Sequence, residues 1–578
     1  MNHPAVLVRR SSVSVALVAA VLVAGCGGVD GPAPTTDGGS DAGILDANTP
    51  IVDLGTVDAG DVDGGGSDVD AGDLDAGRSA DGGGGSDGGA VGSVVAPAGE
   101  VVRAGTGGLL LRGTVLTPTG VLDPGEVLVV GNTITCVAAD CSATAGAGIA
   151  TIVDTHGIIS PGLIDSHNHI AYDFLGEWTP PIPYTDRYTW ANDPTYEEFI
   201  QPFADNRALG TVYCPCAKWG ELRAIVHGTT TVLGGSMQQA CVNGFVRNPD
   251  HYDGLDGDQL TTSIGDVRDI TDAVAAGFVT RFRAAVPLTR LAVHMAEGTD
   301  PTLADEFESF AGRDTRAVPP PTGRLLGVSL LEGTGYTGTG VLIHSVPLTA
   351  AQLMEAADTH AKMVWSPSSN LVLYGGTADI GAWLALGLTV GLGPDWTLSG
   401  EDDMLGELRF ARDYGRTLTI AALTPRRLWE MATLDGAEVV GLAPSIGRLE
   451  VGARADITVI GRTGGDPYGA VIDADARDVR LTMIDGHGYY GDVALEDALA
   501  LNGTCDNFDA CGTPKFLCVA NVPVTQASGA MNPHVAETLE DVHAQLLRVL
   551  AGTIAPLPPG RLPYGRTDLL PLASECAP

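Results

Sequence analysis

Residues 161–169 read PGLIDSHNH, an apolar run that ends in two histidines one residue apart. Side chains along a strand alternate between its two faces, so we expect His167 and His169 to point the same way. Two imidazoles on one face are a pair of nitrogen ligands for one metal ion. A His-x-His pair also occurs by chance on protein surfaces, so the assignment depends on whether later stretches of the chain supply further ligands.

Three later stretches repeat the pattern of a short apolar run that closes on a polar residue. They are residues 291–294 (LAVH), 341–344 (VLIH) and 388–395 (LTVGLGPD). In a (β/α)8 barrel, catalytic residues lie at the carboxyl ends of the strands, where the loops build the site. His167 and Asp395 are 228 residues apart, which fits a barrel of about 250 residues.

These stretches resemble the metal-dependent amidohydrolase superfamily, and within it the cytosine-deaminase and triazine-hydrolase-like branch. Residues 294–297 (HMAE) are similar to the branch's His-x-x-Glu, and residues 366–370 (SPSSN) to its Pro-x-Ser-Asn stretch. Residues 431–437 and 447–456 are similar to the helix and β-return that follow the barrel. The resemblance implies an α/β fold, a (β/α)8 TIM barrel flanked by a small β-sandwich from N- and C-terminal segments.

Residues 109–115 and 126–134 read as strands separated by turn residues. We expect them to pair with residues 455–460 and 479–484 in the small sandwich that the resemblance implies. Barrel strands three and four, expected between residues 234 and 290, cannot be placed from the sequence.

The resemblance also implies a metal site with one divalent ion, zinc first and iron as the alternative. The implied ligands are His167, His169, His294 and Asp395. Bound zinc lowers the pKa of a water molecule to about 7, which makes it a nucleophile at neutral pH. Glu297 is expected to carry the proton of that water to the leaving nitrogen. His344, unless it is a ligand, is expected to donate to the substrate, and Asp395 to act in catalysis as well as in binding.

A binuclear site is the alternative metal arrangement. Binuclear members of the superfamily bridge two metals with a carboxylated lysine, or sometimes another acidic group, from strand four. The lysines of this chain are Lys218, Lys362 and Lys515, and none lies between residues 229 and 294. A lysine bridge is therefore not expected, whereas a bridge from Asp266 or Asp269 stays open.

Two functions from different classes fit the sequence. The first is a hydrolase that cleaves a C–N bond of a cyclic amide or an amino-substituted heterocycle, a small-molecule substrate. The second is a non-catalytic, surface-displayed binding lipoprotein on an amidohydrolase-like barrel. Such a protein would be expected to have lost metal-ligating residues. We favour the enzyme because all of the expected metal ligands are present in the sequence. The aromatic residues of 172–178 and 184–190, with Arg187, either cover a flat ring or pack on themselves as a lid. Trp396 follows the aspartate where nucleobase deaminases often have a small residue, so their substrates do not transfer directly.

The amino-terminal segment predicts export and a lipid anchor. Arg9 and Arg10 precede an apolar run at residues 13–23 and the tripeptide Ala24-Gly25-Cys26. The run is shorter than the about 20 residues of a membrane span, and the order of its parts is that of a signal peptide. The pattern looks like a bacterial lipobox with Cys26 as the lipid-bearing residue, the alternative being an ordinary signal peptide with a chance cysteine. We expect the protein to face the periplasm or the cell surface.

Composition divides the rest of the chain. Residues 27–95 consist mostly of Gly, Asp, Ala and Ser, which predicts a disordered tether. The alternative is that the Asp- and Gly-rich repeats of this segment bind calcium, but these repeats lack the regular period of a calcium-binding repeat. The expected domains are residues 1–26, 27–95, 96–157 and 443–495 (the sandwich), 158–442 (the barrel) and 496–578 (an extension). The net charge of −39 disfavours nucleic acid as a partner. Homo-oligomerisation stays open.

The chain has ten cysteines, which in an exported protein predict disulfides. Cys136 and Cys141 flank a turn and are placed for a local bridge. Two further groups are Cys214, Cys216 and Cys241, and Cys505, Cys511, Cys518 and Cys576. Without Cys26 the number is odd, so at least one thiol is expected to be free or intermolecular. The alternative to disulfides in the last group is a zinc knuckle at residues 505–518, although the spacing of its three cysteines suits a tetrahedral zinc site poorly. A helix is predicted at residues 536–550.

Overall fold

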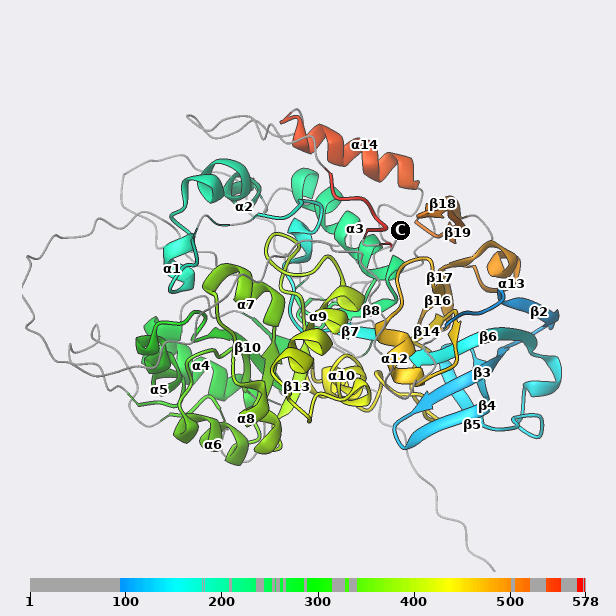
Figure 1. Cartoon of the computed structure of the whole chain (residues 1–578), viewed down its shortest axis with the longest axis horizontal. Coiled ribbons are helices and arrows are strands. Elements are labelled where there is room, and N and C mark those ends of the chain that lie inside the picture. Colours follow the sequence, from blue (N-terminus) through cyan, green and yellow to red (C-terminus); the bar gives the residue numbers. More distant parts are fainter. Residues whose placement is uncertain are drawn as a thin grey trace, which may run out of the picture. The chain divides into compact units, whose positions relative to one another are not determined.

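A computed structural model describes most of the chain after residue 93 (Figure 1). The described residues are 94–178, 180, 182–206, 210–234, 244–251, 255, 260–262, 267–284, 288–313, 328–331, 340–500, 505–519, 537–552, 569–574 and 576. The predicted signal peptide, Cys26, the tether and Asp266 lie outside them. Among the described residues, no helix has the length and apolar character needed to cross a bilayer.

N- and C-terminal strands together build one ten-stranded sheet. Its members are β2 (Glu100–Arg103), β3 (Leu109–Thr117), β4 (Gly120–Val130), β5 (Thr133–Ala138), β6 (Thr151–Pro161), β14 (Ile457–Ile460), β16 (Val479–Ile484), β17 (His487–Asp492), β18 (Asp506–Ala510) and β19 (Thr513–Leu517). The two halves meet where β6 pairs antiparallel with β14, from Ile158↔Ile460 to Pro161↔Ile457. The sheet therefore joins segments about 300 residues apart.

The strands predicted for this sheet are confirmed, with two differences. The predicted strand at residues 126–134 is broken at Gly131, whose φ of 62° makes the turn between β4 and β5. The predicted extension from residue 496 is not separate from the sheet, because β19 pairs with β17 and carries β18 beside it. Residues 515–517 (KFL) at the end of β19 are buried, and Phe516 packs in one core cluster with Leu481 and Met483 of β16.

The second part of the fold is built from parallel strands. They are β7 (Leu163–Asp165), β8 (Thr229–Val232), β9 (Leu260–Thr261), β10 (Arg290–Met295), β11 (Gly340–His344), β12 (Lys362–Trp365) and β13 (Thr389–Leu392). The last five form one sheet in the order β13-β12-β11-β10-β9, and β7 pairs with β8. A parallel bridge between Asn168 and Asp395, with the bond from Ser166 N to Leu392 O at 2.9 Å, joins β7 to β13. A bridge from Thr231 to Arg247 adds a further position beyond β8.

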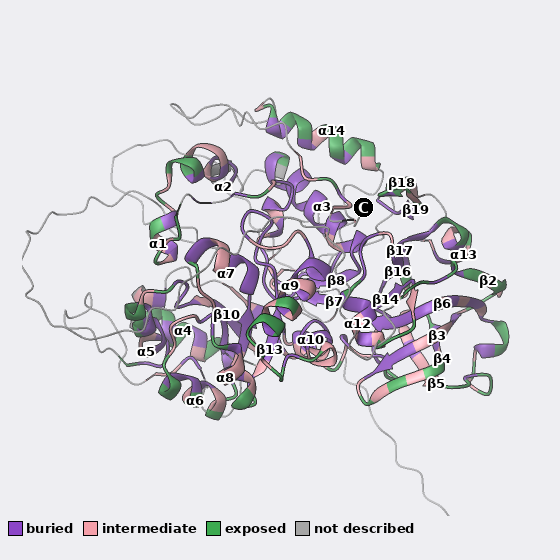
Figure 2. Cartoon of the chain, in the orientation of Figure 1, coloured by how far each residue is buried: buried purple, intermediate pink, exposed green. Residues whose placement is uncertain are grey.

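Side chains from these strands meet in one buried cluster, which we call the interior cluster. Its members are Ile164, Leu233, Leu260, Ala292, Val341, Ile343, Val364, Ala437, Val439, Val440, Leu442 and Ile446. Within β10 and β11, Ala292, Val341 and Ile343 belong to this cluster, while Leu291 and Leu342 pack in a different one with the helices. This alternation means that the strands bury both faces, as parallel strands do when helices cover them. Figure 2 shows β7, β8, β10 and β13 mainly in the colour of buried residues.

Helices follow the parallel strands in chain order. Those described are α1 (Arg187–Trp190), α2 (Gln201–Asn206), α3 (Gly210–Val226), α4 (Asp272–Phe282), α5 (Asp305–Phe310), α6 (Ala350–Asp358), α7 (Pro367–Tyr374), α8 (Ile380–Ala385), α9 (Met404–Thr417), α10 (Pro425–Met431), α11 (Leu434–Val439), α12 (Pro467–Ile472), α13 (Glu496–Leu499) and α14 (Leu539–Leu550). The mixed α/β content confirms the predicted fold class. α14 confirms the helix predicted at residues 536–550, and it buries Val542, Leu546 and Val549 on the side that lies along α3.

Disulfides pair most of the described cysteines. Cys136 bridges Cys141, Cys505 bridges Cys518 and Cys511 bridges Cys576, while Cys214 is also disulfide-bonded and Cys216 is a buried free thiol. The expected local bridge and the expected free thiol are thus confirmed. The zinc knuckle is excluded, since its three sulfurs are all in disulfides. Beyond Cys511 the chain runs to a docked segment in which Leu570 N donates to Phe174 O at 3.0 Å, and Trp219 Nε1 donates to Leu570 O at 2.9 Å.

Removing the bridge between Cys511 and Cys576 is expected to destabilise the fold more than removing the bridge between Cys136 and Cys141. The first closes a loop of 65 residues and the second a loop of five, and a longer loop restricts the unfolded chain more. We expect the C511A/C576A variant to lose about 2–4 kcal/mol in the free energy of unfolding. Urea denaturation without reductant measures the free energy of unfolding, with C136A/C141A as the control. An equal loss in both variants would contradict a stabilising role for the docked segment around Leu570.

Candidate metal centre

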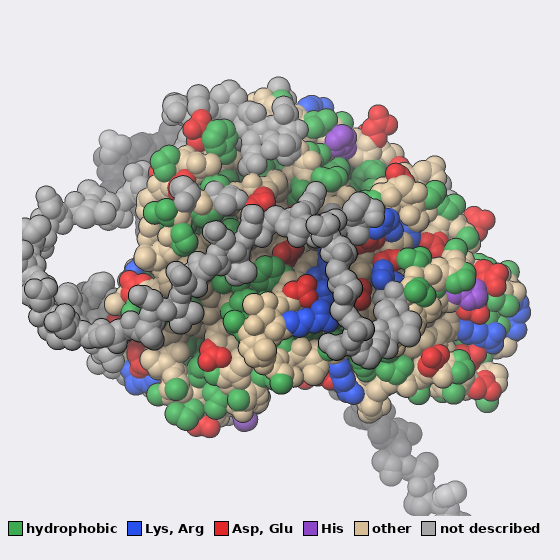
Figure 3. Space-filling model, viewed as in Figure 1, with side chains coloured by type: hydrophobic (Ala, Val, Ile, Leu, Met, Phe, Trp, Pro, Cys, Tyr) green, Lys and Arg blue, Asp and Glu red, His purple; other side chains and the backbone are tan. Residues whose placement is uncertain are grey.

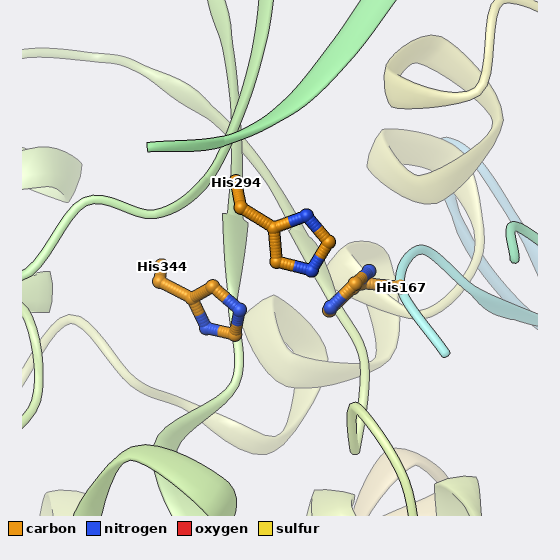
Figure 4. Close-up of side chains that lie close together, drawn as sticks. All are labelled: His167, His294 and His344. Atoms are coloured by element: carbon orange, nitrogen blue, oxygen red, sulfur yellow. The ribbon is translucent and has the colours of Figure 1, made fainter. Parts of the chain in front are cut away.

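The carboxyl ends of the parallel strands bring together side chains from four stretches of the chain. His167 and His169 follow β7, His294 lies in β10, His344 ends β11 and Asp395 follows β13. Strands that run in parallel present these ends at one edge of the sheet. Figure 4 shows the imidazole rings of His167, His294 and His344 turned toward one another. The structure therefore places every predicted ligand, together with His344, in one cluster.

The distances within this cluster fit a single small cation. Two sets of donor atoms lie within 4.8 Å of one another: His167 with His294 and His344, and His167 with His169 and Asp395. Nε2 of His167 lies 3.0 Å from Oδ1 of Asp395, and Nε2 of His294 lies 3.4 Å from Nε2 of His169. Imidazole nitrogens and a carboxylate oxygen are the donors that zinc and iron accept in proteins.

Orphaned nitrogen atoms test whether an ion fits. Nε2 of His167 and Nε2 of His344 are buried and make no hydrogen bond within the described part of the chain. A buried nitrogen without a partner is costly, and a metal ion at this point would satisfy both. Burial lowers the pKa of His294 well below its usual value and that of His344 to about 3, so both rings are neutral and keep a free lone pair. The donor set therefore fits a divalent cation.

The carboxylate of the cluster is ionised despite its burial. Burial by itself would raise the pKa of Asp395, but the neighbouring His167, His344 and His169 rings lower it below its usual range. Oδ2 of Asp395 also accepts a hydrogen bond from Ser369 Oγ at 2.7 Å. That bond leaves Oδ1 directed at the histidines, as a ligand oxygen requires.

The backbone is strained at two of these residues. His344 and Asp395 have φ angles of 66° and 76°, in the left-handed region that costs a residue with a side chain about 1–3 kcal/mol. In β11, Val341 and Ile343 face the interior cluster, so strand alternation would direct the next side chain to the opposite face. We infer that the left-handed turn at His344 redirects its ring toward the other histidines. Such strain is typical of functional positions.

Close backbone contact explains a glycine beside the cluster. A β-carbon at Gly393 would lie 2.6 Å from the backbone N and O of His167. No side chain fits there, so a glycine lets the end of β13 approach the segment that carries the two histidines. The residues 391–393 (GLG) before Asp395 therefore have a packing role.

Glu297 stands next to the cluster with one oxygen bound and the other free to act. Oε1 accepts a hydrogen bond of 2.6 Å from Tyr374, and Oε2 lies 3.7 Å from Nε2 of His344. Burial raises the pKa of Glu297 to about 7, against the lowering effect of the Arg187 guanidinium. A carboxyl group of this pKa both accepts and returns a proton near neutral pH. This geometry can support general acid-base chemistry on a molecule held by the histidines.

Supporting side chains outside the predicted set of ligands hold the histidines in place. Asp165 accepts from the backbone N of His167 at 3.1 Å and from Nδ2 of Asn168 at 2.7 Å. Asn370 Oδ1 lies 3.0 Å from Nδ1 of His344, which requires the proton on Nδ1 and leaves the Nε2 lone pair facing the cluster. In this tautomer His344 binds an ion or accepts a proton; donation to a substrate requires its protonated form. In the sequence, the Ser-Asn pair at residues 369–370 was the feature that indicated such supporting side chains.

The aromatic stretches after β7 pack mainly on one another. Trp178 has ring-centroid distances of 6.1 Å to Tyr184 and 6.4 Å to Trp190. Trp190 also lies 5.5 Å from Trp396, whose ring is 5.6 Å from the His169 ring. Arg187 lies 3.7 Å from Glu306. Of the two expectations for these residues, the self-packed lid is therefore favoured, with Trp396 as the link to the metal cluster.

The lysines lie away from the cluster. Lys218 pairs with Glu537, and Lys515 Nζ is 2.7 Å from Asp492 in the antiparallel sheet. Lys362 starts β12, at the end opposite to the histidines. The side chain of Asp269 is outside the described residues, so an acidic bridge stays untested.

Replacing one histidine should abolish metal binding without unfolding the protein. We expect purified protein to hold about one zinc or iron per chain, and the H294A variant to lose most of it, since a catalytic zinc site needs about three protein ligands. Elemental analysis after dialysis measures the content, with H487A, at an exposed position, as the control. Full metal retention in H294A, or two ions per wild-type chain, would contradict this site.

Comparison with known proteins agrees with the site. Residues 323–487 match the family described as the amidohydrolase family. A 5-methylthioadenosine/S-adenosylhomocysteine deaminase of Desulfitobacterium hafniense is 28% identical over 424 residues, which cover 65% of this chain and 92% of the relative. One of Haloarcula marismortui is 26% identical over 378 residues, covering 61% and 84%. The crystal structure of a guanine deaminase from Bradyrhizobium japonicum has a TM-score of 0.50 and 17% identity over 66% of this chain and 99% of that one, a likeness of fold.

These relatives are catalytic proteins, and the described site keeps all of the expected side chains. The catalytic interpretation is therefore favoured over a binding lipoprotein without activity. The family match over residues 323–487, the relatives and the histidine-aspartate cluster all point to the amidohydrolase superfamily.

Proposed function

We propose that this protein is a metal-dependent hydrolase that removes an amino group from a heterocycle. The observation that carries the proposal is the position of Glu297, whose Oε2 lies beside the histidine cluster while Tyr374 holds Oε1. The relatives that match this chain along most of their own length are deaminases. Hydrolysis of a cyclic amide uses the same groups and is the second candidate.

The chain's own residues have separate roles in this reaction. His167, His169, His294 and Asp395 would hold the ion. A divalent ion at this place would supply an activated water and polarise the substrate. Glu297 accepts one proton of the water while the water oxygen bonds to the ring carbon, and it passes that proton to the departing nitrogen. The C–N bond then breaks and ammonia leaves, while the second proton of the water moves from the new hydroxyl to the ring nitrogen, so that the ring carbon becomes a carbonyl.

We also propose that the parallel strands form the (β/α)8 barrel that the sequence predicted. The strand order from Arg247 through β8, β7, β13, β12, β11 and β10 to β9 supports it, as does the interior cluster that these strands share. Closure would take place between residues 247 and 260, in the region where strands three and four could not be placed from sequence. We propose zinc as the ion, since zinc suits three imidazoles and a carboxylate.

Replacing Glu297 by glutamine separates metal binding from catalysis. The amide keeps the size of the carboxylate but carries no proton, so we expect kcat to fall about 10²- to 10⁴-fold with unchanged metal content. E100Q, at a glutamate whose side chain is 67% exposed in the antiparallel sheet, is the control. Near-normal turnover by E297Q would show that another group carries the proton.

A substrate screen distinguishes the two candidate reactions. Zinc-loaded protein would be assayed for ammonia release from 5′-methylthioadenosine, S-adenosylhomocysteine, guanine and aminotriazines, and for ring opening of cyclic amides. We expect ammonia release from at least one amino-substituted ring. Ring opening alone would favour the second candidate.

We further propose that the protein is exported and anchored through Cys26. The lipobox-like stretch supports this, and so do the disulfides of the folded part, which form in oxidising compartments. On the face drawn in Figure 3, both acidic and basic side chains of the described residues are scattered among hydrophobic and other ones.

The C26A variant should leave the membrane fraction, because the anchor requires the cysteine thiol. Fractionation of cells that make wild-type or C26A protein, with C216A as the control at a cysteine buried in α3, measures this. Membrane-bound C26A would contradict the anchor. Homo-oligomerisation remains a prediction, and light scattering of the purified protein would test it.

A further inference from the structure

A series of three buried side chains, linked by hydrogen bonds, ends on Oε1 of Glu297. Trp190 ends α1, Tyr374 ends α7 and Glu297 follows β10. Nε1 of Trp190 donates to the Tyr374 hydroxyl at 2.8 Å, and that hydroxyl donates to Oε1 of Glu297 at 2.6 Å. All three residues are at least nine-tenths buried.

The direction of these hydrogen bonds is fixed by the chemistry of the indole. The indole N–H can only donate, so the Tyr374 oxygen must accept from Trp190. The single hydroxyl proton of Tyr374 is then left for Glu297. Oε1 is the accepting oxygen of this bond, so a proton carried by Glu297 resides on Oε2, the oxygen that lies 3.7 Å from Nε2 of His344.

Packing holds the donor end of the chain in place. The Trp190 indole contacts the rings of Tyr196 and Trp396, so it cannot rotate without disturbing both. The aromatic lid after β7 therefore supports the orientation of Trp190 rather than only covering the site.

Helix α7 connects this series of hydrogen-bonded side chains to the metal ligands. Ser369 and Asn370 hold Asp395 and His344, and Tyr374 follows Asn370 by four residues, which places both on one helix face. A single short helix thus orients the carboxylate ligand, the histidine of β11 and the acid-base group together.

We propose that Tyr374 is a positioning residue that fixes the Glu297 carboxyl group, so that Oε2 is the oxygen that exchanges protons with water and substrate. Trp190 acts one step further out by fixing the Tyr374 hydroxyl. The kinetic part of this inference rests on the proposed role of Glu297; the hydrogen-bond part does not.

Infrared spectroscopy tests the hydrogen bond without a substrate. In zinc-loaded protein labelled with ¹³C-glutamate, the Glu297 carboxyl band is the one that E297Q lacks. We expect this band to shift in Y374F, to shift less in W190F and to stay in place in Y490F, the control that removes a buried tyrosine hydroxyl bonded to Ala476 O at 2.8 Å in the antiparallel sheet. An unshifted band in Y374F would overturn the inference, whatever the substrate.

Kinetics test the consequence. We expect Y374F to lower kcat about 10- to 100-fold with little change in KM or metal content, as loss of a hydrogen bond to a charged group does. In the E297Q background the Y374F change should cost nothing more, because its effect passes through Glu297. Additive losses would overturn the positioning role, whereas normal turnover by E297Q would overturn the proposed function instead.

Discussion

The burial of one carboxylate among four imidazoles is the constraint on which the site depends. Asp395 is 3% exposed and ionised, a state that is costly unless charge and hydrogen bonds compensate it. Ser369 donates to Oδ2 of Asp395, whereas Nε2 of His167 and of His344 make no hydrogen bond among the described residues. A divalent cation at their centre accounts for the ionised carboxylate and for the orphaned nitrogens at once.

The scaffold holds this arrangement against its own conformational preferences. His344 and Asp395 keep left-handed backbones, and such strain persists only where the surroundings determine it fully. Helix α7 supplies much of that determination through Ser369, Asn370 and Tyr374. The aromatic packing around Trp190 and Trp396 adds a rigid wall on the other side of the cluster. Precise placement of groups is what acid-base and metal chemistry require.

The sequence predicted the parts of the site that end apolar runs. His167, His294, His344 and Asp395 each close such a run, so strand patterns located them, whereas the pairing of N- and C-terminal strands was implied by the family resemblance. Tyr374 was missed because it lies inside a helix and carries no motif; only its spacing of four from Asn370 pointed to the site. β9 and the bridge at Arg247 were not located from the sequence, because β9 has two residues and Arg247 contributes a single bridge. β18 and β19 were missed because their order depends on pairing with a distant strand.

One measurement addresses the account most directly, namely the coordination of the ion in purified protein. X-ray absorption at the zinc edge reports the number, type and distance of the ligands. The account predicts one ion with imidazole nitrogens and carboxylate oxygen at about 2.0–2.2 Å. A second metal about 3.5–4 Å away, or scattering from sulfur at about 2.3 Å, would contradict it.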